Sequence, residues 1–214
     1  MSRIILSSQE KYLNSFEKKK DSLLKSMEEF ADENNVPILS NLSANLLEQL
    51  IVMNKPQRVL EIGTAIGYST IRIARKLGRK ATIHTIEKSA NNIAIAKENF
   101  KKSGLGNRIK LIEGDALRIL PQLQKKYDFI FLDADKEDYK RLFDYSMVLL
   151  KKGGIIFIDN LLWHGYVAAN KIPTKYKRST NFIRDFNRIF MNQPSLSSTI
   201  LPVGDGIGIG VKVL

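Results

Sequence analysis

Apolar and polar positions alternate along the chain with two different periods. Short apolar runs bounded by turn residues predict strands that are buried on both faces of a parallel sheet. Apolar residues spaced three and four positions apart predict helices. We expect strands at 58–62, 81–86, 109–113, 127–132, 155–158, 197–202 and 207–213.

Helices are predicted between the first five strands and before the last two. They cover residues 69–77, 90–103, 116–123, 136–149 and 181–190, and a loop is predicted from Asp159 to Thr180. Strands separated by helices imply a parallel sheet with helices on both faces. Only four residues separate the last two strands, so these should pair antiparallel. The expected fold is α/β, with a seven-stranded, mostly parallel sheet and an antiparallel C-terminal strand.

The first 55 residues are predicted to be helical and to cap the α/β core. One helix is expected from Lys11 to Asn34 and another from Asn41 to Met53. Val36-Pro37-Ile38 separates them, because a residue that precedes proline avoids the helical region. We expect a single domain over 1–214, with the cap at 1–55 and the core at 56–214.

Composition is typical of a globular protein, with 43% apolar and 26% charged residues. There is no apolar run of 18 residues, so no membrane span is expected. The N-terminus lacks the apolar core and cleavage site of a secretory signal. The absence of cysteine excludes disulfides and thiolate chemistry and fits a cytoplasmic protein.

The net charge is +12, from 34 basic and 22 acidic residues. Such a charge attracts polyanions, although general cationic solubility is an alternative explanation. Between Lys171 and Arg188, six basic residues stand against Asp185 alone, with Tyr176 and Phe182 among them.

Polar or acidic residues follow the first five predicted strands. These residues are Glu61, Glu87, Asp115, Asp133 and Asp159-Asn160. Ligands of open parallel sheets bind outside the carboxyl ends of the strands, so we expect a site there. One or two of these acids could instead serve only as helix N-caps.

The nine residues from Glu61 to Ser69 read Glu-Ile-Gly-Thr-Ala-Ile-Gly-Tyr-Ser. The glycines are four apart, which is not the G-x-G-x-x-G spacing of a dinucleotide fold. The pattern resembles the first motif of class I S-adenosylmethionine (SAM) methyltransferases. Glycine lets the backbone pass close to a ligand, and the carboxylate can bind the ligand's ammonium group. A glycine-containing turn of any α/β protein is the alternative.

Two further acids fit an adenosine ligand. Glu87 ends the second predicted strand, where a carboxylate can accept both ribose hydroxyls, as it also does in NAD-binding folds. Asp115, at the end of the third strand, could lie near the adenine amino group.

Asp133 and Asp159-Asn160 end two strands that we expect to be neighbours. Two carboxylates and an amide oxygen make a hard oxygen site for Mg²⁺. Lys136 follows Asp133 by three positions. Beside a divalent cation its ammonium form is disfavoured, so it could act as a general base. An ordinary surface lysine is the alternative.

Together with Leu132–Lys136, 159–167 and 202–206, the glycine motif resembles the metal-dependent O-methyltransferases, which include catechol and caffeoyl-CoA O-methyltransferases. The chain looks most similar to the bacterial branch that methylates 5-hydroxyuridine in tRNA to 5-methoxyuridine. It departs from the plant enzymes after Val36-Pro37. The resemblance implies a SAM- and Mg²⁺-dependent enzyme with a Rossmann-like class I fold, and it suggests a homodimer.

The resemblance also implies roles for individual residues. The catalytic residues would be Lys136, as the base, and Asp133. The metal ligands would be Asp133, Asp159 and Asn160. The SAM-binding residues would be Leu39, Glu61, Gly63, Ser69, Glu87, Asp115, Ala116 and Asp133.

The methyl acceptor is open between tRNA and a small catechol-like phenol. In the first case Lys175, Lys177 and Arg178 would contact phosphates, and Tyr176 or Trp163 would stack on a base. In the second case the same segment would be a solvated loop with an aromatic lid. His164 could be an acid–base group near the metal, but a single histidine in a loop more often serves only as a hydrogen-bonding residue. An NAD-type oxidoreductase and a SAM-binding regulator without turnover are the remaining alternatives.

Overall fold

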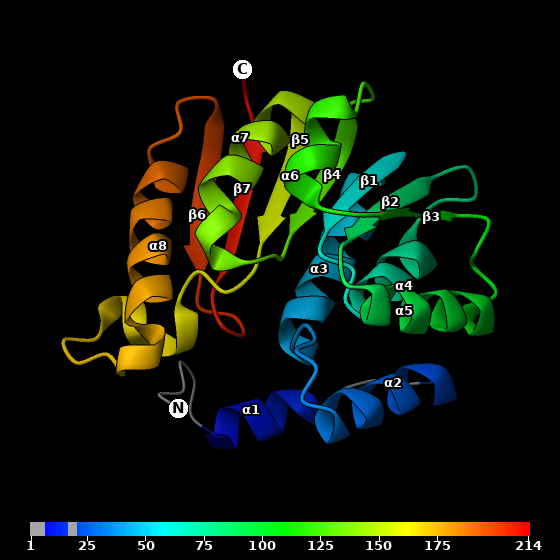
Figure 1. Ribbon diagram of the computed structural model, residues 1–214, viewed down its shortest axis with the longest axis horizontal. Coiled ribbons are helices and arrows are strands. Elements are labelled where there is room, and N and C mark those ends of the chain that lie inside the picture. Colours follow the sequence, from blue (N-terminus) through cyan, green and yellow to red (C-terminus); the bar gives the residue numbers. More distant parts are fainter. Residues whose placement is uncertain (1–6, 17–20) are drawn as a thin grey trace.

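Seven strands and eight α-helices make up the described part of the protein, residues 7–16 and 21–214 of the computed structural model (Figure 1). The strands are β1 (Arg58–Ile62), β2 (Thr82–Glu87), β3 (Ile109–Glu113), β4 (Tyr127–Leu132), β5 (Leu150–Ile158), β6 (Leu196–Leu201) and β7 (Ile207–Lys212). The helices are α1 (Ser7–Asn14), α2 (Ser22–Glu33), α3 (Asn41–Asn54), α4 (Tyr68–Lys76), α5 (Ala90–Ser103), α6 (Ala116–Ile119), α7 (Tyr139–Leu149) and α8 (Thr174–Met191).

The strands form one sheet in the order β3-β2-β1-β4-β5-β7-β6. Strands β1 to β5 are parallel, β7 pairs antiparallel with β5, and β6 pairs antiparallel with β7. The predicted Rossmann-like α/β fold with antiparallel closing strands is confirmed. The order reverses at β1, which lies between β2 and β4, and this reversal opens a crevice at the carboxyl ends of these strands.

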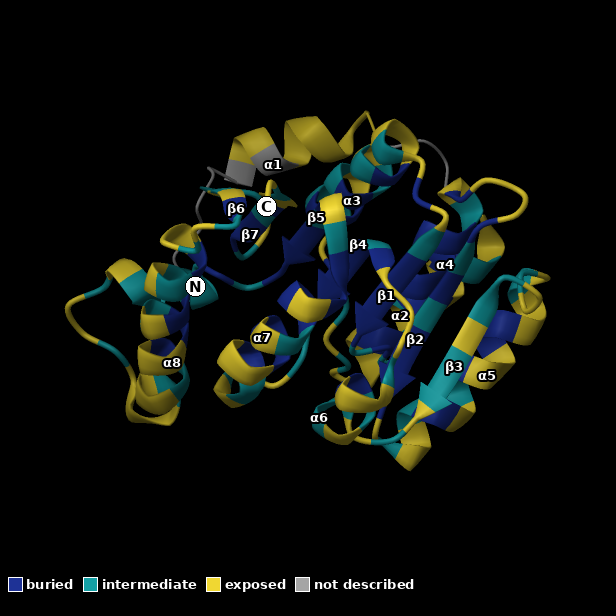
Figure 2. Ribbon diagram, turned by 90° about the horizontal axis from the view of Figure 1, so that it is seen from above, coloured by how far each residue is buried: buried dark blue, intermediate teal, exposed yellow. Residues whose placement is uncertain are grey.

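The central strands are buried (Figure 2), because helices pack on both faces of the sheet. Alternate side chains of a strand point to opposite faces. In β1, Leu60 and Ile62 belong to the core formed with α7 and α8, whereas Val59 belongs to the core formed with α3 and α4. A third cluster joins α2 to α4 and α5 through residues such as Met27 and Phe100. These cores hold the strand ends in fixed positions.

The N-terminal cap contains two described helices where one was predicted from Lys11 to Asn34. Helix α1 ends at Asn14, and α2 begins after Asp21, whose side chain accepts a hydrogen bond from Leu24 N. Residues 17–20 of the predicted helix lie outside the described residues. An N-cap carboxylate stabilises a helix start, so capping by Asp21 accounts for the start of α2, a signal that the apolar periodicity does not reveal.

Strand β5 begins earlier than predicted. It starts at Leu150 and includes Gly153-Gly154, which were expected to end the preceding helix and not to belong to the strand. A Cβ on Gly154 would lie within 3.0 Å of the Asp128 carbonyl oxygen, so the glycine allows β4 and β5 to pack closely at this irregular pairing.

Helix α8 also begins earlier than predicted, at Thr174 instead of Asn181. Pro173 precedes its first residue, and proline ends the loop without needing a backbone donor. The first two turns carry mostly exposed polar residues, so they lack the apolar period that identifies a helix. The basic residues from Lys175 to Arg178 therefore lie on a helix and not on a loop. None of the helices in the described ranges is long and apolar enough to cross a membrane.

Candidate active site

A cavity of about 840 Å³ lies at the carboxyl ends of β1, β2, β4 and β5. Its volume is in the range of cofactor and small-molecule sites. Several residues predicted from the sequence line it together: Gly63, Glu87, Asp115, Ala116, Asp133, Lys136, Asp159 and Asn160. The cavity therefore joins the expected cofactor residues to the expected metal residues in one space.

The turn after β1 brings two backbones into close contact. Gly63 has a φ of 103°, and a Cβ there would collide with the Asp133 carbonyl oxygen. Asp133 N donates to Ile62 O at 3.0 Å, which ties the ends of β1 and β4 together. Only glycine fits this turn, because it combines positive φ with close backbone approach.

Glu61 is buried next to the motif that lines the cavity, but it does not line the cavity itself. Its side chain is fully buried, and its carboxylate accepts hydrogen bonds from the hydroxyls of Ser69 (2.6 Å), Thr85 (2.6 Å) and Thr70. Burial raises the pKa of Glu61 to about 7, although the three hydroxyls oppose the rise. In this structure Glu61 and Ser69 contact each other, and neither lines the cavity.

Glu87 ends β2 and is held by three backbone amides. Its Oε2 accepts from Ala65 N at 2.8 Å, and its Oε1 accepts from Lys88 N at 3.0 Å and Ser89 N at 2.8 Å. Ser89 caps α5, so Glu87 is not a helix N-cap. The carboxylate is fixed at the cavity wall and retains acceptor capacity for a ligand hydroxyl.

Asp115 caps α6, since its Oδ1 accepts a hydrogen bond from Leu117 N at 2.9 Å. The capping interpretation thus applies to this acid, which also lines the cavity together with Ala116. Leu39 does not line the same cavity.

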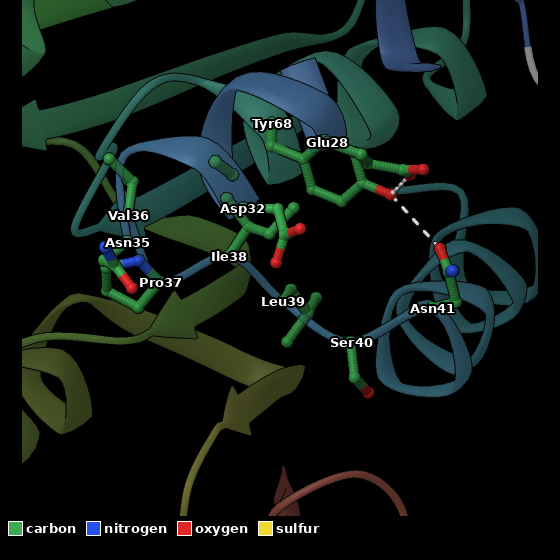
Figure 3. A pocket seen from close by; sticks show the side chains of 11 residues that line it. Glu28, Asp32, Asn35, Val36, Pro37, Ile38, Leu39, Ser40, Asn41 and Tyr68 are labelled. Carbon is green, nitrogen blue, oxygen red and sulfur yellow. Dashed lines mark hydrogen bonds between the residues drawn. The ribbon is translucent and has the colours of Figure 1, made fainter. Parts of the chain in front are cut away.

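Leu39 belongs instead to a second cavity of about 510 Å³ between α2, the segment 35–41 and Tyr68 (Figure 3). The Tyr68 hydroxyl donates to Glu28 and lies 3.3 Å from Asn41 Oδ1 in this view. Pro37 and Ile38 line both cavities, so this segment is the wall between them.

Lys136 stands at the centre of the acidic end of the main cavity. Its Nζ donates to Asp133 Oδ1 (3.1 Å), Tyr139 Oη (2.6 Å) and Asn160 Oδ1 (2.7 Å). Burial disfavours the ammonium charge, but Tyr139, Asp133 and Asp159 outweigh it and raise the pKa of Lys136. In the ligand-free protein Lys136 is thus a cation held by oxygen atoms.

Asp159 is 5% exposed and accepts a hydrogen bond from its neighbour Asn160 N at 2.7 Å. Burial and the nearby Asp133 carboxylate raise the pKa of Asp159 to about 7. A buried carboxylate beside a second carboxylate is stabilised by a cation.

The donor set fits a divalent cation. Two carboxylates, of Asp133 and Asp159, and the amide oxygen of Asn160 gather around the Lys136 ammonium group, and these are the hard oxygen ligands that Mg²⁺ prefers. Within residues 7–16 and 21–214, no three Asp, Glu or His side chains are grouped as a metal site. The set therefore depends on Asn160 as its third ligand.

Four aromatic rings stand beside the metal candidates. Tyr166 and Tyr176 stack with centroids 5.1 Å apart, and His164 contacts Tyr176 at 5.5 Å and Trp163 at 5.0 Å. Trp163 Nε1 donates to Ser179 Oγ, which attaches the 3-10 segment Trp163–Ala168 to α8. Trp163 and His164 also line the cavity, so an aromatic wall faces the expected acceptor position.

Three of the six basic residues between Lys171 and Arg188 already bind groups of the protein itself. Arg178 pairs with Glu137 at 2.9 Å, and Arg188 pairs with Asp185 at 3.3 Å. Arg184 donates to the carbonyl oxygens of the segment 166–169 and so has a structural role. These contacts leave fewer cations for a polyanion than the sequence suggests.

Sequence reasoning assigned no role to Tyr139 and Asp205. Tyr139 Oη lies between Lys136 and the Asp159 carbonyl oxygen. Asp205 accepts hydrogen bonds from His164 N at 2.5 Å and Asn160 Nδ2 at 3.4 Å. The pentapeptide 202–206 belongs to the family-like pattern, and the two glycines that flank Asp205 are the sequence feature that could have indicated this residue.

Comparison with known proteins identifies the family of this chain. Residues 14–213 match the family described as O-methyltransferase. A curated relative, caffeoyl-CoA O-methyltransferase 2 of Petunia hybrida, is 35% identical over 186 residues, which cover 81% of this chain and 75% of the relative. The chain therefore belongs to the O-methyltransferase family.

Solved structures give the same assignment. A candidate caffeoyl-CoA O-methyltransferase from Staphylococcus aureus superposes with a TM-score of 0.90 at 34% identity, covering 96% of this chain and 100% of the other. An O-methyltransferase from Bacillus cereus, solved with S-adenosylhomocysteine (SAH), gives 0.84 at 30% identity, with 96% and 97% covered. The protein is a SAM-dependent O-methyltransferase, which excludes the oxidoreductase and regulator alternatives.

Proposed function

We propose that the protein methylates a hydroxyl group of a small aromatic acceptor that carries a neighbouring oxygen, as in a catechol, and that it needs Mg²⁺. The observation that carries this proposal is the meeting of Asp133, Asp159 and Asn160 in the cavity that also contains Gly63 and Glu87. A donor set of this kind suits an acceptor with two adjacent oxygens.

The residues would divide the work as follows. Glu87 would hold the ribose of SAM, and Gly63 would admit its methionine part. Asp133, Asp159 and Asn160 would hold the cation, which when bound lowers the pKa of an acceptor hydroxyl. Beside a bound cation the ammonium form of Lys136 would be disfavoured, so that Lys136 or water would accept the hydroxyl proton. The acceptor oxygen would then form a bond to the SAM methyl carbon as the carbon–sulfur bond breaks, leaving SAH, and alignment of the three atoms supplies much of the rate.

Two observations support a small acceptor over tRNA. Trp163 and His164 line one side of the cavity, with Tyr176 packed against His164, and an aromatic wall of this kind suits a flat ring. The curated relative from Petunia is named for caffeoyl-CoA, which we take as the first acceptor to test. In favour of 5-hydroxyuridine in tRNA stand the charge of +12 and the exposed lysines 171, 175 and 177.

The deciding experiment measures methyl transfer from SAM to a caffeoyl thioester, to the matching coumaroyl thioester with a single hydroxyl, and to tRNA that carries 5-hydroxyuridine. We expect product only from the caffeoyl compound, and none after chelation of the metal. Asp159→Asn should remove turnover but retain SAH binding, whereas Asp144→Asn, an exposed acid on α7, should match the wild type.

Full turnover in chelator would contradict the metal requirement. Conversion of the tRNA without conversion of the caffeoyl compound would establish the nucleic acid as the acceptor. Equal methylation of the two thioesters would show that a neighbouring oxygen is not required.

We also propose that the protein is a homodimer. Helix α1 and the turn that follows it expose Tyr12, Leu13 and Phe16, with exposed fractions of 64%, 45% and 64%. An apolar patch of this kind suits a protein interface. Light scattering after gel filtration should give twice the monomer mass of 24.3 kDa, and substitution of these three residues by serine should give the monomer. A monomeric wild type would refute the proposal.

A further inference from the structure

Asn160 is the weakest member of the candidate metal set, because its side chain has two different ends. The carbonyl oxygen can bind a cation, whereas the amino group repels one. A rotation of the amide by 180° would exchange these ends at almost no steric cost. A site that depends on Asn160 therefore needs neighbours that distinguish oxygen from nitrogen.

The structure provides such a neighbour on each side of the amide. Lys136 Nζ, which can only donate, lies 2.7 Å from Asn160 Oδ1. Asp205 Oδ2, an acceptor when ionised, lies 3.4 Å from Asn160 Nδ2. This is a long hydrogen bond, but the carboxylate charge still favours the amino end of the amide on its own side.

Asp205 is itself rigidly placed. The turn between β6 and β7 is closed by a hydrogen bond from Gly206 N to Val203 O at 2.9 Å. It is joined to the segment after β5 by Leu161 N to Gly206 O and by Leu162 N to Asp205 O, both at 2.9 Å. A Cβ at position 206 would collide with Leu162. The turn thus holds Asp205 directly behind the segment that carries Asn160.

The second oxygen of Asp205 is also in use. Asp205 Oδ1 accepts a hydrogen bond from His164 N at 2.5 Å, and His164 has a φ of 55°. A non-glycine residue rarely adopts this conformation without support. One carboxylate therefore satisfies the backbone of the aromatic segment and the side chain of Asn160 at the same time.

We propose that Asp205 is a positioning residue that sets the amide of Asn160 with its oxygen toward the metal position and holds the turn at His164. This inference rests on the proposed metal-dependent function. Asp205 itself lies behind Asn160 and acts through it.

The Asp205→Asn variant should bind the metal poorly, although asparagine has nearly the same shape as aspartate. A carboxylate accepts at both oxygens, but an amide accepts at only one. If the new amide keeps its oxygen on His164 N, its amino group faces the amino group of Asn160. Because the contact to His164 N is the shorter one, we expect it to persist. The amide of Asn160 then faces another donor on that side, so only Lys136 still favours its original orientation and the flipped orientation becomes populated.

The test measures Mn²⁺ binding by electron paramagnetic resonance at pH 8. Asp205→Asn should weaken Mn²⁺ binding by about 10- to 100-fold, the usual effect of removing a partner of a metal ligand. SAH affinity and the unfolding midpoint should be unchanged. Asp144→Asn, which removes an exposed acid of the same charge, should bind Mn²⁺ like the wild type.

A second background separates orientation from general damage. In Asn160→Asp the side chain presents oxygen in either orientation, so adding Asp205→Asn should not weaken Mn²⁺ binding further. Equal losses in the two backgrounds, or wild-type affinity in Asp205→Asn alone, would overturn the inference. A joint loss of SAH binding and folding in Asp205→Asn would also overturn it, by showing a purely structural role.

A metal-free measurement distinguishes failure of this inference from failure of the proposed function. The side-chain amide signal of Asn160 in a ¹⁵N spectrum is identified by its absence in Asn160→Asp. It should shift in Asp205→Asn and stay in place in Asp144→Asn. If the wild type bound no Mn²⁺, the metal-dependent function would fail, while an unmoved signal would refute the role of Asp205 independently.

Discussion

The buried carboxyl group of Glu61 predicts a specific dependence of stability on pH. The perturbation is Glu61→Gln, which keeps the shape of the side chain and removes its ability to ionise. In the native protein the carboxylate has no exposure to solvent and is surrounded by the hydroxyls of Ser69, Thr70 and Thr85. Burial raises its pKa to about 7 from an ordinary value of 4.5.

The sign of this pH dependence follows from the number of protons bound by the folded and unfolded states. Between pH 4.5 and about 7 the folded protein keeps a proton on Glu61 that the unfolded chain has already released. Stability from this group is therefore full below pH 4.5, falls as the pH rises to about 7, and is constant above it. The difference of 7 − 4.5, at about 1.36 kcal/mol for each pH unit, gives a loss of about 3 kcal/mol.

The assay is urea unfolding of the SAM-free protein, followed by circular dichroism from pH 4 to 8. Subtracting the curve of Glu61→Gln from that of the wild type cancels the other titrating groups. The difference should fall by about 3 kcal/mol across the window, whereas Glu113→Gln, an exposed acid on β3, should give no comparable fall. A flat difference curve, or one that rises with pH, would refute the account of Glu61 as a carboxyl group penalised by burial.

Three further changes test the cavity. Gly63→Ala should lower stability by about 3 kcal/mol and remove most SAH affinity, because the residue has a positive φ and a Cβ would collide with the backbone of Asp133. The control is Gly78→Ala, which has open space around it. Equal melting temperatures of the two variants would contradict the close approach. Glu87→Gln should weaken SAH binding by about 10-fold in calorimetry, since a hydrogen bond to a charged group is lost; unchanged affinity would remove Glu87 from the ribose site. Arg184→Met should speed hydrogen exchange in residues 163–169, where Arg184 binds three carbonyl oxygens, while Arg188→Met should not; equal exchange rates in the two variants would argue against this tether.

Local pattern was sufficient to predict most elements. Strands 58–62, 109–113 and 127–132 and helix 90–103 have the predicted bounds. The errors fall where local signals are weak. The exposed first turns of α8 carry no apolar period, and Gly153-Gly154 resemble a helix end although tertiary packing places them in β5. The local sequence pattern indicates which side chains of an element face the core. In a polar segment this pattern is missing, and the choice between loop and helix depends on what packs beside the segment.

The candidate site shows the same division. Acidic residues at strand ends could be read from the chain, because parallel strands bring their carboxyl ends to one edge. The sequence by itself therefore determined the class of fold, the edge at which chemistry occurs, and the residues Asp133, Asp159 and Asn160 as candidates.

Only the tertiary structure decided how these groups meet. It buried Glu61 outside the cavity lining, surrounded Lys136 with oxygen atoms, and brought Asp205 to Asn160 across 45 residues of chain. Such contacts depend on strand order and on the packing of turns against one another. These contacts cannot be predicted from the local sequence, because the two partners of each hydrogen bond are distant in the chain.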